Sequence, residues 1–197
     1  DSANIVINAK SITPTASASN KTYNGNTSTT CTISLTGVVT GDTVNASAGS
    51  GTFADKNVGT GKKVTCSSIT LSGTSASNYT LSKTSAETTA NIIAKALTIS
   101  SHSVNYNGNK IFDRTYSTGI GSETIKLTYT SYSANAGTYT YATTAGSGKF
   151  TLSKTDGTGS QSNYSISSAG NLTINKIAST CPTISGTAAT YDGESHS

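Results

Sequence analysis

Few residues in this chain have the side chains that catalysis or metal binding needs. The 197 residues include only two histidines, His102 and His196, and three cysteines. Ser-His-Asp catalysis needs a base held beside a nucleophile, and serine is too common here for any one serine to stand out. We interpret His102 as a surface residue at the start of a strand. The sequence has no Cys-x-x-Cys pair, histidine pair or Asp-rich calcium loop, so we expect no catalytic residue, metal site or cofactor.

The acidic residues are scattered along the chain. Paired carboxylates for glycoside cleavage need two acids in one cleft. Asp42 and Asp55 have no clear counterparts in the second half of the chain, where Glu123 and Asp156 lie in different sequence contexts. Asp42, in Thr-Gly-Asp-Thr-Val, fits a turn because aspartate accepts local backbone hydrogen bonds. We expect that the protein is not an enzyme.

Cys31 and Cys66 are the residues best placed for a covalent bond, because each lies on the expected inward face of a strand. Two interpretations stay open. They form a disulfide between two strands, as an exported protein allows, or they pack as small buried hydrophobic residues. Cys181 has no partner in the sequence. A Lys–Asn or Thr–Gln cross-link has less support, because Gln161 is the only glutamine and no Lys/Asn/acid set recurs.

Three Tyr-x-Gly triplets recur at nearly constant spacing, with their tyrosines 83 and 85 residues apart: Tyr23 to Gly25, Tyr106 to Gly108, and Tyr191 to Gly193. The dipeptides Asn-Gly and Asp-Gly are strong turn signals because both residues accept positive φ. Tyrosine is large and amphipathic, so it can cover a thin core while its hydroxyl meets backbone or water. We interpret the triplets as turn anchors, with a ligand-binding platform as the alternative.

Other segments recur in the same order, which predicts repeated units. A lysine-bearing segment appears at 3–13, 90–100 and 171–180, and an Asn-Tyr pair at 78–79 and 163–164. Asn-x-Gly-Thr likewise occurs in both halves of the chain. We therefore divide the chain as follows: 1–9, the last strand of a preceding repeat; 10–94, unit one; 95–175, unit two; and 176–197, the start of a further repeat.

The composition predicts an all-β protein with a thin core. Roughly a third of the residues are Ser or Thr, yet two prolines and ten tyrosines argue against disorder. Apolar and polar residues alternate in 31–35, 63–71, 123–132 and 137–144, as half-buried strands require. In 63–71 the alternation shifts by one residue, which indicates a bulge. We expect tandem Ig-like β-sandwich modules of about 80 residues, with β-grasp-like modules as the alternative.

The charge pattern disfavours nucleic-acid and membrane-spanning roles. Thirteen basic and nine acidic residues give a net charge of +4, and Arg114 is the single arginine. A nucleic-acid-binding protein would instead show a basic stripe. No stretch approaches the run of about 18 apolar residues that a membrane helix needs. We expect no nucleic-acid partner and no membrane-spanning segment.

Unit one resembles the YDG repeat of bacterial surface and filamentous-haemagglutinin-like proteins. The similarity includes the Tyr-Asn-Gly triplet at 23–25, and the run 53–61 is its most specific part. Unit two resembles the related MBG repeats through 106–109, 134–139 and 162–166, but it lacks the Phe-Ala-Asp-Lys-Asn stretch. The resemblance implies extracellular tandem modules, of Ig-like type, in long adhesins or cell-wall proteins. It brings no catalytic residues.

We expect a structural stalk that projects an adhesive or other functional domain from a bacterial cell surface or cell wall. Its partners would be the neighbouring repeats of the same chain. One alternative is that the repeats themselves bind glycan or host protein through their tyrosine-bearing loops. A second is a subunit of an extracellular fibre, assembled by pairing of open strand edges.

Overall fold

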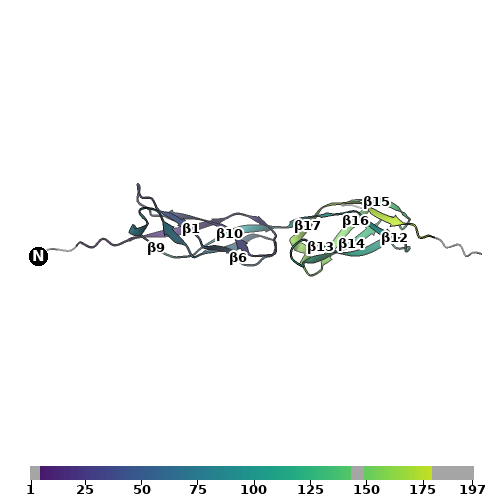
Figure 1. Ribbon diagram of the computed structural model, residues 1–197, viewed down its shortest axis with the longest axis horizontal. Coiled ribbons are helices and arrows are strands. Elements are labelled where there is room, and N and C mark those ends of the chain that lie inside the picture. Colours follow the sequence, from purple (N-terminus) through teal and green to yellow (C-terminus); the bar gives the residue numbers. More distant parts are fainter. Residues whose placement is uncertain (1–4, 143–148, 179–197) are drawn as a thin grey trace, which may run out of the picture.

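The computed structural model describes residues 5–142 and 149–178. These residues form β-strands and two short 3-10 helices, without an α-helix, so the all-β expectation is confirmed. Figure 1 shows two groups of strands that follow one another along the long axis of the molecule. The first group corresponds to unit one and the second to unit two. Within the described residues, no helix is long and apolar enough to cross a membrane.

Unit one contains strands β1 to β10 and the helix η1. Their bounds are β1 Lys10–Ala18, β2 Lys21–Thr22, β3 Ser28–Thr29, β4 Cys31–Thr36, β5 Asn45–Ser47, β6 Ser50–Phe53, β7 Gly59–Ser67, β8 Thr70–Ser72, η1 Ala76–Asn78, β9 Tyr79–Leu81 and β10 Ala86–Ile93. The strands pair in the orders β4-β1-β9, β2-β10-β7-β6-β3 and β5-β8.

Unit two contains strands β11 to β18 and the helix η2. Their bounds are β11 Lys95–Ile99, β12 His102–Asn105, β13 Ile111–Ser117, β14 Thr124–Ser131, β15 Gly137–Tyr141, β16 Lys149–Asp156, η2 Gln161–Asn163, β17 Tyr164–Ala169 and β18 Leu172–Asn175. The strands pair in the orders β11-β17 and β12-β18-β15-β16-β14-β13.

Three pairings recur in the two units. The first strand runs parallel to the strand that follows the 3-10 helix, β1 with β9 and β11 with β17. The second strand runs parallel to the last, β2 with β10 and β12 with β18. The last strand is also antiparallel to a third strand, β10 to β7 and β18 to β15. Sequence segments that recur along the chain therefore occupy matching places in the two units.

The alternation of apolar residues decides which face of each strand is buried. In β14, Ile125, Leu127 and Tyr129 are each at most 1% exposed, whereas Lys126 between them faces solvent. Successive side chains of a strand point to opposite faces, so this spacing places three large residues in one core. The alternation expected in 123–132 is confirmed.

The expected bulge in 63–71 is wrong. β7 ends at Ser67, and Ser68 has a φ of 55°. This left-handed residue turns the chain out of its sheet, and β8 then pairs with β5 instead. The shift in the apolar pattern marks a change of sheet, because the second half of the segment faces a different neighbour.

A disulfide joins Cys31 of β4 to Cys66 of β7, with their Cα atoms 6.0 Å apart. β4 and β7 belong to different sheets, so the bond links two of the sheets of unit one. Gly51 lies opposite Cys66 in the ladder, and a Cβ at this glycine would lie 2.7 Å from Cys31 Sγ. The disulfide therefore occupies the space that a side chain at Gly51 would need.

The connection between the units is very short. β10 ends at Ile93 and β11 begins at Lys95, so Ala94 alone separates the last strand of unit one from the first strand of unit two. Residues 5–9 and 176–178 lie in no strand. The assignment of 1–9 and 176–197 to neighbouring repeats stays a prediction.

Loss of the disulfide is expected to destabilise unit one by about 3 to 4 kcal/mol, because the bond closes a loop with a sequence separation of 35 residues and thereby restricts the unfolded chain. Hydrogen exchange read by mass spectrometry, with and without reductant, resolves the two units in the intact chain. Amides of β7 and β10 should lose protection after reduction, and the Cys31→Ser/Cys66→Ser double variant should behave alike.

Unit two is the internal control for this measurement, because it contains no cysteine. Amides in β14 and β16 should exchange at unchanged rates. Equal loss of protection in β14 and β7, or unchanged protection in β7, would contradict the assignment of this stabilisation to the disulfide.

Candidate functional site

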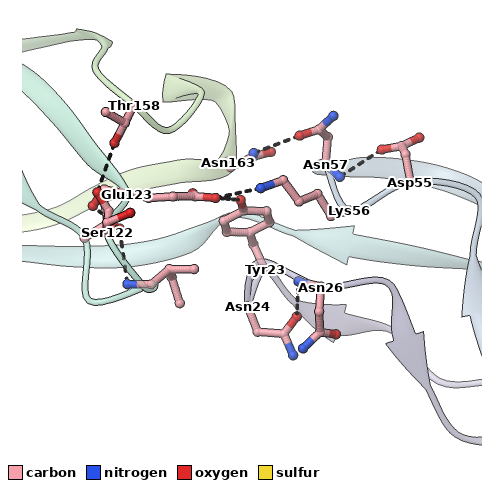
Figure 2. A network of polar contacts seen from close by, with 12 residues as sticks. Tyr23, Asn24, Asn26, Asp55, Lys56, Asn57, Ser122, Glu123, Thr158 and Asn163 are labelled. Carbon is pink, nitrogen blue, oxygen red and sulfur yellow. Dashed lines mark hydrogen bonds and ion pairs between the residues drawn. The ribbon is translucent and has the colours of Figure 1, made fainter.

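A network of polar side chains joins the end of unit one to the start of unit two (Figure 2). The hydroxyl of Tyr23 lies 2.8 Å from both carboxylate oxygens of Glu123. Lys56 Nζ forms an ion pair with Glu123 Oε1 at 2.7 Å, and the hydroxyl of Tyr164 donates to Oε2 at 2.6 Å. We call these four residues the junction network. Two of its donors, Tyr23 and Lys56, come from unit one, whereas Glu123 and Tyr164 belong to unit two.

Tyr23 is positioned by the strand before it and by the turn after it. Its backbone N–H donates to the carbonyl of Ile93 at 2.8 Å, and the side chain is only 2% exposed. Gly25 adopts a φ of +81°, and a Cβ at this position would lie 2.6 Å from Cγ2 of Ile120 in unit two. The glycine is needed both for the turn and for the close approach of the neighbouring unit.

A second contact between the units involves two asparagines. The side chain of Asn163 in unit two donates through Nδ2 to Asn57 Oδ1 at 3.0 Å, and its Oδ1 accepts from the backbone N–H of Val58 at 2.9 Å. Asp55 supports this loop by accepting from the N–H of Asn57 at 2.8 Å. Asn163 is 1% exposed. A buried side-chain amide therefore has partners for both its donor and its acceptor across the junction.

Glu123 lies at the end of a turn that leads into β14. Its backbone N–H donates to the carbonyl of Ile120 at 2.9 Å, and its carbonyl accepts from the N–H of Thr118 at 3.1 Å. The Thr118 hydroxyl also lies 2.9 Å from this carbonyl. Above the carboxylate, the rings of Tyr23 and Tyr164 meet edge to face with their centroids 5.4 Å apart. This arrangement combines charge-assisted hydrogen bonds with a favourable aromatic pair.

The charges of the junction network are coupled. Burial raises the pKa of Glu123, but hydrogen bonds from Lys56, Tyr164 and Tyr23 outweigh burial and hold this pKa below its usual value. Burial, followed by the hydrogen bond to the carboxylate, raises the pKa of both Tyr23 and Tyr164. The ionised glutamate also raises the pKa of Lys56. The network is therefore built for a carboxylate, two neutral phenols and an ammonium group.

The predicted turn anchors have different environments in the structure. Tyr23 packs as expected, but its hydroxyl meets a carboxylate of the neighbouring unit rather than backbone or water. Tyr106 has the same backbone setting, with its N–H donating to Asn175 at 2.9 Å, yet its side chain is 40% exposed. Gly108 has a φ of +78°, as its turn requires. The third triplet, Tyr191 to Gly193, lies outside the described residues.

The expectation that Asp42 has no counterpart in unit two is wrong. The hydroxyl of Tyr79 donates to Asp42, as that of Tyr164 does to Glu123. The N–H of Asp42 also donates to the carbonyl three residues earlier, at Val39, at 3.1 Å. Asp42 and Glu123 therefore occupy equivalent turns, each beside the tyrosine of an Asn-Tyr pair.

A sequence signal for this equivalence exists. Both 36–44 and 118–125 begin with Thr-Gly and end with an acidic residue, a threonine and a β-branched residue. The first segment is one residue longer, so an alignment without a gap separates the two acids. The acid also changes from aspartate to glutamate, which further hides the correspondence.

His102 lies away from the junction, at the start of β12. Its Nδ1 is 3.1 Å from Arg114 Nη1, and its ring packs against that of Tyr129 with a centroid distance of 5.3 Å. Burial, followed by the charge of Arg114, lowers the pKa of His102. Among the described residues, no group of three or more His, Cys, Asp or Glu side chains is arranged to hold a metal ion.

Tyr23→Phe is expected to weaken coupling of the units by about 1 to 2 kcal/mol, because it leaves the largely buried Glu123 carboxylate without one donor. Residual dipolar couplings of the whole chain report the relative orientation of the units and its spread. The variant should broaden that orientation while each unit keeps its own fold.

Tyr106→Phe is the matched control, because it removes the same hydroxyl from an equivalent turn that faces solvent. It should leave the couplings unchanged. If Tyr23→Phe also left them unchanged, the junction network would not fix the orientation.

The coupling is also expected to depend on pH at both extremes. The pKa of Glu123 is lowered, so its contribution is complete above the unperturbed value of 4.5 and is lost as the pH falls through the lowered pKa. The pKa values of Tyr23 and Tyr164 are raised, so their contribution is complete below about 10 and is lost as the pH rises through the raised values. Small-angle scattering at pH 7 and at lower pH would detect the loss of coupling in acid. In Glu123→Gln the scattering should no longer change between these pH values. An unchanged pH dependence in that variant would assign the effect to another group.

Comparison with known protein families finds a match for unit one, which supplies one side of the junction. Residues 8–90 match the model of the YDG domain. The matched region runs from just before β1 into β10, includes Tyr23 and Lys56, and covers less than half of the chain. Neither a curated protein nor a solved structure matches the chain. Residues 8–90 are therefore a YDG domain, and its Tyr-x-Gly turn forms one side of the junction with unit two.

Proposed function

We propose that this chain is part of a structural stalk in an extracellular bacterial surface protein. Its units are tandem repeats that hold an adhesive or other functional domain away from the cell, and they carry out no catalysis. The observation that supports this role is the junction network, in which a nearly buried carboxylate of unit two is bound by two side chains of unit one. A spacer needs such a junction, because its reach depends on the orientation of successive units.

The contacts at the junction come from separate loops, as is needed to fix the orientation of the two units. Tyr23 comes from the turn after β2, and Lys56 and Asn57 come from the loop before β7. These two loops contact different parts of unit two, around Glu123 and Asn163. The covalent connection at Ala94 supplies a third attachment. Attachments at three separate places resist both bending and twisting, which one flexible linker cannot do.

For the fold of each unit, we propose an Ig-like β-sandwich. In unit one the disulfide links two sheets whose inward residues share a core, as in a sandwich. A β-grasp arrangement would pack a helix against one sheet, and the part of the chain that the structure describes has no α-helix. We also propose that unit two is an MBG-like repeat of the same type.

The extracellular location is supported by the chemistry of the chain. Disulfides persist in oxidising compartments and are rare in the cytosol, and in the disulfide of unit one Cys66 is buried in the core while Cys31 packs partly buried against it. Only 11% of the residues are charged, and many exposed positions are Ser, Thr or Asn. A surface of this kind suits a spacer that must not associate with other molecules.

The alternative of glycan or host-protein binding through tyrosine-bearing loops has less support at the first loop. Tyr23 is 2% exposed and its hydroxyl is engaged by Glu123, so a ligand would have to separate the units to reach it. The alternative of a fibre assembled by strand pairing would require open strand edges at the ends, whereas the observed junction uses side chains of turns.

The proposed function predicts that these units can be replaced by others of equal length and stiffness. In cells that display the full-length protein, residues 10–175 would be exchanged for unrelated rigid modules of the same length. Adhesion should be retained, because the role depends on distance and not on surface chemistry. Exchange for a flexible Gly/Ser segment with the same number of residues is the matched control, and it should reduce adhesion.

Display at the cell surface would be quantified for each variant with an antibody against a terminal tag. Loss of adhesion with the rigid replacement, at unchanged display, would move the function into the units themselves. Equal adhesion with the rigid and the flexible replacement would show that stiffness is irrelevant.

A further inference from the structure

We propose that the end of unit two opposite the junction is a second docking site, built from Tyr106, Asn135 and Ala136. Its occupant is a further repeat unit that presents an acidic side chain and an Asn-Tyr pair at its own end. This inference deepens the proposed function by naming the partner. It rests on the unit-to-unit coupling in that proposal, and it does not depend on a location at the cell surface.

The backbone around Tyr106 matches the backbone around Tyr23. The N–H of Tyr106 donates to the residue that ends β18, and the N–H of Tyr23 donates to the residue that ends β10, at 2.9 and 2.8 Å. The turn glycines also match, with φ values of +78° at Gly108 and +81° at Gly25. Both tyrosines therefore leave the end of a unit in the same backbone setting.

The two turns differ in what covers them. Tyr23 is 2% exposed because unit two packs on it, whereas Tyr106 is 40% exposed. A Cβ at Gly25 would meet Ile120 of unit two, but a Cβ at Gly108 would have no atom within 4 Å. The place that the neighbouring unit fills at the first turn is therefore open at the second, within the part of the molecule that the structure describes.

The loop that carries the second contact is also repeated. Asn135 and Ala136 lie directly before β15, as Asn57 and Val58 lie directly before β7. Together with Tyr106, they line an open and largely apolar groove of about 570 Å³. Asn135 thus corresponds to Asn57, whose side-chain oxygen accepts the hydrogen bond from Asn163 at the first junction.

The chain itself passes along this groove. Residues 176–178, which follow β18, complete its lining. At the first junction the chain leaves β10 and enters β11 at Lys95, and Lys176 is the corresponding residue of the lysine-bearing segment. A unit that began at Lys176 would therefore start beside Tyr106, as unit two starts beside Tyr23.

The required partner surface exists in this chain on both units. Unit two uses its copy of this surface, around Glu123 and Asn163, at the junction with unit one. The copy on unit one consists of Asp42 bound by Tyr79, with Asn78 exposed beside it and Val39 50% exposed. Val39 corresponds to Ile120, which contacts Gly25. The occupant is therefore defined by an apolar residue, a carboxylate held by its own tyrosine, and a free asparagine amide.

One difference predicts a weaker second site. Ala134 stands at the position that Lys56 has in unit one, three residues before the Gly-Thr that begins the next strand in each case. The carboxylate of a docked unit would still accept a hydrogen bond from the Tyr106 hydroxyl, but it would have no lysine at this position with which to form an ion pair. Docking at Tyr106 should consequently depend less on salt than docking at Tyr23.

A tandem chain tests the proposal: residues 1–175 followed by residues 10–197 of a second copy, so that Lys10 takes the place of Lys176. Hydroxyl-radical footprinting would measure the reactivity of each tyrosine. Tyr106 of the first copy should become protected to the level of Tyr23, several-fold below its reactivity in the single chain. Residual dipolar couplings should show the added unit aligned with unit two.

Three variants of the tandem chain assign the contact. Tyr106→Ala in the first copy and Asp42→Asn in the second should each broaden the orientation of the added unit and leave the first junction unchanged. Ala134→Lys should tighten the second junction and make it salt-sensitive. Because Tyr106 is exposed and Ala134 is partly exposed, these variants should keep the fold, and unchanged hydrogen-exchange protection of β14 would verify this.

Unchanged reactivity of Tyr106 in the tandem chain would overturn the proposal. The same conclusion would follow if the orientation of the added unit were the same with and without Tyr106→Ala. These outcomes are independent of the adhesion experiment. Docking in the tandem chain together with loss of adhesion after rigid replacement would refute the spacer role alone.

Discussion

The junction between the units depends on one carboxylate that is bound by donors from both of them. Glu123 is mostly removed from water, and a buried charge without donors is costly. Tyr164 of its own unit supplies one hydrogen bond, while Tyr23 and Lys56 of the neighbouring unit supply the others. Separation of the units would remove the donors of Tyr23 and Lys56 and return the carboxylate to water, so these contacts favour the relative orientation in which all three donors reach Glu123.

The fold explains why such a junction can recur. In each unit, the Tyr-x-Gly turn and the Asn-x-Gly-Thr loop lie at one end, and the acidic turn and the Asn-Tyr pair lie at the other. The same strand pairings hold these four segments in place. Complementary surfaces at opposite ends of one module are what head-to-tail addition of further units would require.

The two units achieve a thin but stable core in different ways. Unit one links its sheets through the disulfide between Cys31 and Cys66. Unit two has no cysteine and packs more aromatic side chains, including Tyr129 and Phe150 stacked with centroids 5.7 Å apart. Aromatic rings bury a large apolar area each, so they can provide the cohesion that a covalent bond provides in unit one.

Local patterns in the sequence determined the all-β class, the inward faces of β14 and the recurrence of the Tyr-x-Gly and Asn-Tyr pairs, because strand periodicity and turn chemistry act over a few residues. They left the pairing of Cys31 with Cys66 open. Only the tertiary structure decided that Tyr23 binds a carboxylate 100 residues away and that Asp42 corresponds to Glu123. Such contacts depend on how the ends of two folded units meet, and a one-residue insertion hides them from any local comparison.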